Sequence, residues 1–459
     1  MMLGAASGAI LVPLNTTMLA VALPGVMAEF GLGADTVSSL ISLYLGAVAI
    51  TLPVSGSLGD RFGHRRLFMG GVVLFGLSSA IAVGAHSFIV LQIARVFQAV
   101  SGAFVSTTSA ALIREAAPPA RRGEAFGIFD LLVSASAAAG PFVGGILVGA
   151  FGWRSLFVVA VPVAAIAALS VGVWLRPAAS ERGTRRQAGA ASRRPLDPVG
   201  LLLLGMLIVV FLVALRPVAN WLQGVAALAL VPLAIVFVRV ELRAAHPAVD
   251  PRLFAARPFA AAVAGVFGNT VVLHGCFFLV PLLVERLLHE SPTTSGLVLL
   301  GISGVGALVA PLGGRTSDLR GRRMPVAVGM LVIAAGLAPL AIPALAGSSL
   351  TVGVGMAVVG LGMGVAGSPR QAAAFESVGP DRVGMAAGTY YTGRYLGGVV
   401  GVTVAGSILA AGVTASGVSL GFGILAAVAL GVAVISLGLP GRAVRPAPDA
   451  APLADSVID

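Results

Sequence analysis

Long apolar segments, each bounded by charged residues, proline or glycine, follow one another along almost the whole chain. Each is close to the length that crosses a bilayer, since about 20 apolar residues span a hydrocarbon core about 30 Å thick. Lipid offers the backbone no hydrogen-bond partners, so we expect every segment to be a helix and the fold to be an all-α integral membrane fold. Fourteen segments fall near residues 4–28, 36–57, 67–86, 88–113, 123–149, 154–175, 198–215, 220–239, 259–282, 293–313, 325–345, 349–374, 384–411 and 417–439.

The composition excludes several classes of protein. Hydrophobic residues make up 58% of the chain and charged residues only 10%, whereas a soluble domain carries about 25% charged residues. The net charge is +11, but no long basic run or stacking-aromatic pattern accompanies the arginines, so we expect no nucleic-acid partner. All basic residues are arginine, which excludes a P-loop lysine and Schiff-base chemistry. With Cys276 as the single cysteine and only scattered histidines, we expect no metal and no cofactor.

The arginines are distributed unequally between the two sets of connections. A cytoplasmic amino terminus leaves only Arg154, Arg216 and Arg286 outside, with Arg95 and Arg394 inside spans. Because positive residues favour cytoplasmic connections, we expect both termini in the cytoplasm of a bacterial inner membrane.

An internal repeat relates the two halves of the chain, because residues 56–66 recur as residues 314–323. In both copies an acid has glycine four residues before it, glycine three after it and arginine five after it. Repeated halves indicate alternating access, and an acid beside helix ends and arginines can latch one conformation. The candidate latch residues are Gly56, Asp60, Arg61, Gly63, Arg65, Arg66, Asp318, Gly321 and Arg323.

The first copy resembles the signature loop of the major facilitator superfamily. Further segments resemble blocks of its fourteen-span drug:proton antiporter family, namely 14–24, 95–98, 140–145, 153–157, 195–200 and 394–398. The resemblance implies a major-facilitator-type fold and a monomer that exports small apolar or cationic compounds against protons. It also implies six parts: a six-helix bundle (1–175), a cytoplasmic linker (176–197), an inserted hairpin (198–239), a second linker (240–258), a second six-helix bundle (259–439) and a disordered tail (440–459).

Two sets of residues inside the spans are candidates for function. Gly140, Pro141, Gly144 and Gly145 resemble the antiporter motif, which implies a gate, although close helix packing explains small residues as well. Charged and polar groups are costly within lipid and mark pathways or coupling sites. The candidates for proton coupling or a substrate cavity are Asn15, Arg95, Gln98, Asp130, Asn269, His274, Tyr391 and Arg394.

Several of these polar candidates have an alternative interpretation. Asn15 stands where the family usually carries an acid, so we expect Asp130 to take the proton, or else to pair with neighbouring arginines at the inner face. Arg95 could snorkel, and His274 could be a satisfied buried histidine. A charged patch at residues 285–290 is predicted to be a solvated outer loop.

The expected partners of an exporter are a small-molecule substrate, protons and the lipid bilayer. Three other functions remain possible. The missing acid at Asn15 favours a facilitator or symporter of a metabolite. A sensor or scaffold would need a partner-binding domain, and no long soluble loop is present. An enzyme is the weakest alternative, because no nucleophile with a base is visible.

Overall fold

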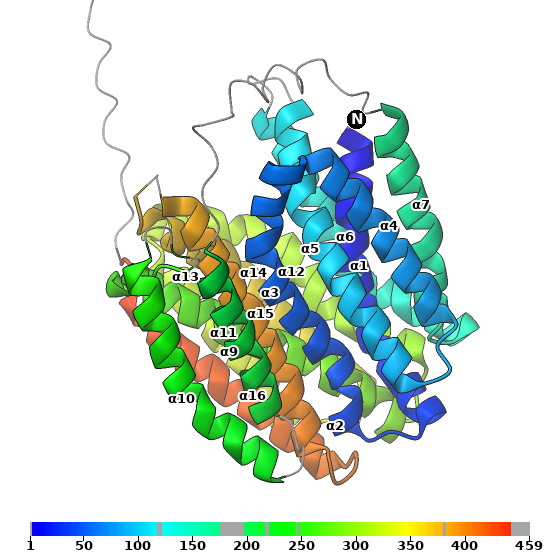
Figure 1. The fold of residues 1–459 in the computed structure, drawn as a ribbon. Coiled ribbons are helices and arrows are strands. Elements are labelled where there is room, and N and C mark those ends of the chain that lie inside the picture. Colours follow the sequence, from blue (N-terminus) through cyan, green and yellow to red (C-terminus); the bar gives the residue numbers. More distant parts are fainter. Residues whose placement is uncertain are drawn as a thin grey trace, which may run out of the picture.

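A computed structural model gives the arrangement of the chain (Figure 1). It describes residues 2–116, 122–174, 197–215, 220–244, 247, 249–379 and 382–441. Every regular element in these residues is a helix, which is the backbone solution that an apolar environment requires. The linker at 176–196 and the tail from 442 onward lie outside the described residues.

Six long helices form the first bundle. Their bounds are α1 (Met2–Phe30), α3 (Ser39–Phe62), α4 (His64–Val83), α5 (Phe88–Ala116), α6 (Arg122–Phe151) and α7 (Ser155–Trp174), with a short α2 (Ala34–Val37) before α3. Helix α1 packs against α6 and α7, while α4 packs between α5 and α7. Gly63 joins α3 to α4 with φ of 94°, a left-handed conformation that glycine adopts without steric cost.

Two helices follow as an inserted pair, α9 (Pro198–Ala214) and α10 (Asn220–Arg243). Asp197 caps α9 by accepting a hydrogen bond from the Gly200 backbone amide at 2.8 Å. The pair contacts the bundles mainly through α9, which packs on α3. Its outward side is apolar, with Leu228 79% exposed. An apolar exposed face of this kind suits contact with lipid.

The second bundle also has six long helices, and several continue into short helical turns. They are α11 (Arg257–Pro281) with a π-helix η3 (Leu282–Leu287), α12 (Pro292–Arg320), α13 (Arg323–Leu337) with η4 (Ala338–Ala341), α14 (Ser349–Glu376), α15 (Val383–Ile408), and α16 (Ala415–Ile435) with η6 (Ser436–Gly438). A short η2 (Pro251–Ala255) precedes them. Helix α12 packs on α14, and α11 packs between α15 and α16.

The helices agree with a protein that crosses a membrane many times. Among the described residues, eleven helices are long and apolar enough to span a bilayer. Two further apolar helices, Ser155–Ser170 and Pro198–Ala214, are shorter. Helix α15 is 26 residues long but carries Arg394 and several hydroxyl side chains, which lower its hydropathy.

The two bundles meet along a seam made of three helix pairs: α6 with α12, α3 with α15, and α1 with α11. We call the end of the molecule where α1 begins the amino-terminal side, and the end where α1 finishes the far side. In Figure 1 the amino terminus, the start of α4 and the end of α5 lie together at the top, and α2 lies at the bottom.

Candidate functional site

A buried arginine organises the interior of the first bundle. Arg95 on α5 is 1% exposed, and its Nη1 donates to Asn15 Oδ1 on α1 at 2.7 Å and to Gln98 Oε1 at 2.8 Å. Gln98 Nε2 in turn donates to Ser79 Oγ on α4 at 2.8 Å. One connected set of hydrogen bonds therefore joins three helices. These hydrogen bonds offset the free-energy cost of burying the polar side chains.

An aromatic ring completes this Arg95 cluster. The Arg95 guanidinium carbon lies 4.2 Å from the centre of the Tyr44 ring on α3, a cation–π contact. Thr16 Oγ1 donates to Tyr44 Oη at 2.9 Å. Arg95 is thus enclosed by side chains, and the alternative that it snorkels to the membrane surface is wrong. Local sequence patterns gave no reason to select Tyr44, because it lies 51 residues from Arg95.

The expected proton site, Asp130, cannot be compared with the Arg95 cluster. The backbone of Asp130 belongs to α6, but its side chain is outside the described residues, as is the side chain of Asp60. Every acidic side chain that the structure does describe lies at or near a helix end or in a connection. The Arg95 cluster is built on the neutral acceptors of Asn15 and Gln98.

The candidates of the second bundle gather around α11 and α15. Thr270 Oγ1 donates to the Arg394 carbonyl at 2.8 Å, and His274 Nδ1 lies 3.2 Å from the Thr270 carbonyl oxygen. Asn269 is 7% exposed, and its Oδ1 is buried without a hydrogen-bond partner. Tyr391 Oη accepts a hydrogen bond from Gln371 on α14 at 3.3 Å. Of these residues, Arg394 and His274 are linked through the backbone and side chain of Thr270.

A third arginine inside the spans was not selected from the sequence. Arg370 on α14 is 3% exposed, and its Nε and Nη1 have no hydrogen-bond partner. It packs beside Gly265 on α11, where an added Cβ would lie 2.9 Å from Arg370 Cδ. Its position six residues before the end of α14 could have drawn attention, because the preceding residues of that helix are apolar.

The glycine motif of α6 packs at close helix crossings. A Cβ added to Gly144 would lie 3.0 Å from Met18 Cα on α1. On Gly145 it would lie 2.6 Å from the Pro292 carbonyl oxygen of α12, and on Gly296 it would lie 2.4 Å from the Pro141 carbonyl oxygen. Small residues let helix backbones approach closely. The motif therefore makes contact both within its bundle, to α1, and across the seam, to α12.

Gly140 belongs to the same set of contacts, since a Cβ there would overlap the Thr17 side chain of α1. Hydrogen bonds reinforce the crossing of α6 with α12. Thr293 Oγ1 donates to the Gly145 carbonyl at 3.3 Å, and Ser303 Oγ donates to the Ala138 carbonyl at 2.8 Å.

The two repeated loops share a glycine in the left-handed region: φ is 94° at Gly63 and 81° at Gly321. In the second copy, Arg322 bridges two acids, with Nη1 2.9 Å from Asp318 Oδ1 and Nη2 2.6 Å from Glu376 Oε1. Hydrogen bonds first to Glu376 and then to Asp318 raise the pKa of Arg322 above its ordinary value, so this guanidinium stays charged.

The arginine that pairs with Asp318 is thus Arg322, which was not among the candidate latch residues. Arg323 Nε instead donates to the Leu439 carbonyl at 3.0 Å. In the first copy, Arg61 lies over the Phe62 ring at 5.6 Å. Residues Gly56, Arg65 and Arg66 lie on the same amino-terminal side, close to the junction of α3 and α4.

The charged patch at residues 285–290 is not simply a solvated loop. Glu285 and Arg286 lie on the π-helix η3, and Arg286 Nη2 donates to the Pro24 carbonyl of α1 at 3.1 Å. Glu285 Oε1 is buried without a hydrogen-bond partner. The prediction of a loop was wrong for these two residues, because the chain continues helically past Pro281 and reaches the other bundle, although the Arg286 side chain is exposed.

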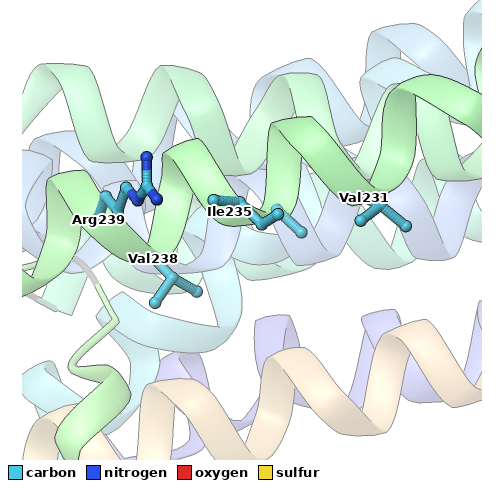
Figure 2. Close-up of a pocket in the computed structure, with 5 residues that line it drawn as sticks. Val231, Ile235, Val238 and Arg239 are labelled. Atoms are coloured by element: carbon cyan, nitrogen blue, oxygen red, sulfur yellow. The ribbon is translucent and has the colours of Figure 1, made fainter.

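An apolar groove lies beside the inserted pair. A space of about 420 Å³ is lined by Val231, Ala234, Ile235, Val238 and Arg239 of α10. Figure 2 shows the Arg239 side chain turned away from Val238 on this helix. A second space of about 360 Å³ continues it and reaches Phe267 of α11 and Leu396 of α15. Leu396 therefore faces the inserted pair.

Comparison with known proteins identifies the family. A sequence profile of the Major Facilitator Superfamily matches residues 5–402. The chain belongs to the major facilitator superfamily. It is thus a multi-pass membrane transporter, and the predictions of this superfamily and of a transporter rather than an enzyme are confirmed.

Several members of the superfamily are similar over most of their length. The chain is 32% identical over 416 residues to the uncharacterized MFS-type transporter YwoD of Bacillus subtilis, covering 90% of each chain. It is 29% identical to the multidrug resistance protein Stp of Mycobacterium tuberculosis, over 89% of this chain and 75% of that protein. It is 32% identical to the tetracenomycin C resistance and export protein of Streptomyces glaucescens, over 73% and 62% of the two chains.

Solved structures of transporters share the fold. The peptide transporter POT, as a point mutant in complex with alafosfalin, matches with a TM-score of 0.68 and 15% identity over 95% of this chain and 93% of that one. The D-xylose-proton symporter matches with a TM-score of 0.65 and 16% identity over 96% and 97%. At this identity the likeness concerns the fold alone.

Proposed function

We propose that this superfamily member exports small, largely apolar molecules by alternating access and is driven by protons, as in the fourteen-span drug:proton antiporter family. The observation that carries the proposal is the close crossing of α6 with α12, where Gly145 and Gly296 bring two bundles into backbone contact without an intervening side chain. The two helix ends that meet there can part as rigid bodies, which alternating access requires.

The contacts across the seam indicate which side is closed. Three hydrogen bonds join described residues of the two bundles: Arg286 to Pro24, Thr293 to Gly145, and Ser303 to Ala138. All three lie from the middle of the helices to the far side, at the end of α1 and α6 and the start of α12. We infer a state that is closed on the far side.

The fourteen-span arrangement assigns these sides to the membrane. We infer that both termini lie on one side of the membrane, because six helices, the inserted pair and six further helices are an even number of spans. The arginine asymmetry supports the cytoplasm of a bacterial inner membrane as that side. The closed far side then faces outward, and the state is one in which substrate enters from the cytoplasm.

Export and proton coupling are supported by different observations. Relatives named for multidrug resistance and for tetracenomycin C export support an outward direction. The proton assignment depends on Asp130, an acid whose backbone lies about eight residues into α6. A carboxyl group inside a span is costly when charged and unpaired, so protonation can bias the conformation of its helix.

Transport in proteoliposomes tests this proposal. The full-length chain should accumulate an apolar dye against its gradient when a pH gradient is imposed, and Asp130→Asn should abolish that accumulation while preserving downhill exchange. Asp35→Asn is the matched control, because Asp35 lies on the short α2 at the far side. Accumulation that ignores the pH gradient would refute proton coupling.

A facilitator or symporter of a metabolite is the second candidate. The observation that favours it is the Arg95 cluster, in which Asn15 offers an amide oxygen rather than a carboxylate to the arginine. An amide cannot take up a proton in the physiological range. Downhill uptake at equal rates with and without a pH gradient would support this candidate.

A further inference from the structure

The described charges inside the spans are all positive. Arg95 is the eighth residue of α5, Arg394 is the twelfth residue of α15, and Arg370 lies six residues from the end of α14. At 1.5 Å per residue, Arg394 is ~16 Å from the start of its helix, near the middle of a bilayer. The acidic side chains that the structure describes lie at helix ends or in connections, well away from this depth.

None of the three arginines is neutralised by a described carboxylate. Arg95 donates to two amide oxygens and lies over an aromatic ring, so its hydrogen bonds are made but its charge remains. Arg370 is buried with two nitrogens unpaired. In an environment of low dielectric constant, such charges act over long distances because little water screens them.

Arg394 is the arginine of this set that is exposed. Leu396, two residues further along α15, faces the groove beside the inserted pair. Two residues correspond to about 200° around a helix, so Arg394 points to the opposite side of α15. Gly398 lies one helical turn after Arg394 on that side of α15, and a Cβ added to it would lie 2.9 Å from His274 Nδ1 of α11 and 2.9 Å from Leu45 Cδ1 of α3 in the first bundle.

Arg394 therefore lies at the seam, among side chains of both bundles. A charge on lipid at this depth would cost at least ~2.5 to 3.5 kcal/mol, so the guanidinium must face a space that water or a ligand can reach. Tyr391 lies three residues before Arg394 on α15, and side chains three residues apart are neighbours on a helix. This combination suits a planar acidic compound, because arginine pairs with carboxylates in a bidentate manner and aromatic rings stack.

We propose that the transported compounds are anionic amphiphiles, in which a carboxylate or phenolate binds Arg394 while an apolar aromatic body lies against the tyrosines of α15. This inference rests on the proposed export function and replaces its broad substrate range with a charge requirement. Cationic compounds are disfavoured at this position, because the guanidinium of Arg394 would repel them.

Binding to the purified full-length protein separates these substrate classes without any variant. Fluorescein and rhodamine 123 share a xanthene skeleton, but at pH 8 the first is an anion and the second is a cation. Fluorescence anisotropy should give at least 10-fold tighter binding of fluorescein, which corresponds to about 1.4 kcal/mol. Equal binding of the two dyes, or preference for rhodamine 123, would overturn the inference.

Variants then assign the effect to the seam. Arg394→Gln should weaken fluorescein binding and export at least 10-fold and leave rhodamine 123 unchanged or improved, and Arg394→Lys should retain part of the anion preference. Arg239→Gln is the control, because it removes the same charge from the exposed face of α10. Active export of rhodamine 123 but not of fluorescein would disprove the anion requirement and still support the export proposal. Dye movement that follows only the dye gradient, with equal rates for the two dyes, would contradict both the export proposal and the anion requirement.

Discussion

The crossing of α6 with α12 should respond strongly to a single methyl group. In Gly145→Ala the new Cβ would lie 2.6 Å from the Pro292 carbonyl oxygen and 3.1 Å from Gly296 Cα. Both neighbours are backbone atoms, which cannot move aside by a change of rotamer. The helices α6 and α12 must therefore separate slightly to accommodate the methyl group, and the far side can no longer close fully.

The expected energy follows from studies of overpacked interiors, in which an inserted methyl group costs about 1 to 3 kcal/mol. The alanine also raises helix propensity by roughly 0.5 to 1 kcal/mol, but α6 is helical in both conformations and this gain cancels. The equilibrium between the closed and open far side should therefore shift about 5- to 150-fold toward the open state. Transport should slow because return to the closed state becomes rarer.

Spin labels on the far side can measure this shift. Phe151 at the end of α6 and Leu350 at the start of α14 are each 76% exposed, and they belong to different bundles. With the buried Cys276 replaced by alanine, the label distance should lengthen in Gly145→Ala. Gly431→Ala is the matched control, because no atom lies within 4 Å of its added Cβ. An unchanged distance distribution together with wild-type transport in Gly145→Ala would refute this account.

Three further predictions concern charged groups. Arg95→Ala should lower the thermal unfolding midpoint, because two buried side-chain oxygens lose their donor at about 1 to 3 kcal/mol each; an unchanged midpoint would mean that water replaces the guanidinium. Arg322→Ala should slow transport and lower the midpoint only modestly, because the side chains of its partners Asp318 and Glu376 are 73% and 45% exposed and ion pairs with exposed partners contribute at most about 1 kcal/mol each; the exposed Arg320→Ala serves as its control. In an Asp130→Asn background, Asn15→Asp should restore part of the gradient-driven export by placing a titratable carboxyl beside Arg95; export that stays absent would exclude that position as a proton site.

Hydrophobic pattern alone predicted most helix positions to within a few residues. The predicted span at 4–28 corresponds to α1 (Met2–Phe30), and the span at 349–374 corresponds to α14 (Ser349–Glu376). The end of α11 was less predictable. Charged residues at 285–290 suggested a loop, yet a π-helix carries the chain to Leu287, because burial of Leu282, Leu283 and Val284 outweighs the polarity that follows.

The candidate residues were easier to select than to connect. Arg95 was chosen because a charge within an apolar segment is costly, and Asn15 and Gln98 because they lie in segments that resemble the family's blocks. Nothing local indicated that Arg95 bonds to both of the others. That contact depends on the packing of α1 on α5, which brings together residues 80 positions apart. Arg370 was missed for a related reason, since its burial is decided by α11 and not by its own helix.

The interactions within and between the bundles differ in strength, and this difference favours movement at the seam. Inside the first bundle, Arg95 on α5 makes a charge-assisted hydrogen bond to Asn15 on α1, which contributes about 1.5 to 3 kcal/mol and would be lost if the two helices separated. Across the seam, Thr293 and Ser303 donate from neutral hydroxyl groups to carbonyl oxygens, at about 0.5 to 1.5 kcal/mol each. The charge-assisted hydrogen bond from Arg286 to the Pro24 carbonyl comes from an exposed side chain, so water can replace it when the far side opens. The adjoining glycines contribute close backbone contact but no interlocking side chain. Separation of the far side therefore costs less than deformation of either bundle, so each bundle should move as a rigid unit while the contacts of α6 with α12 open and close.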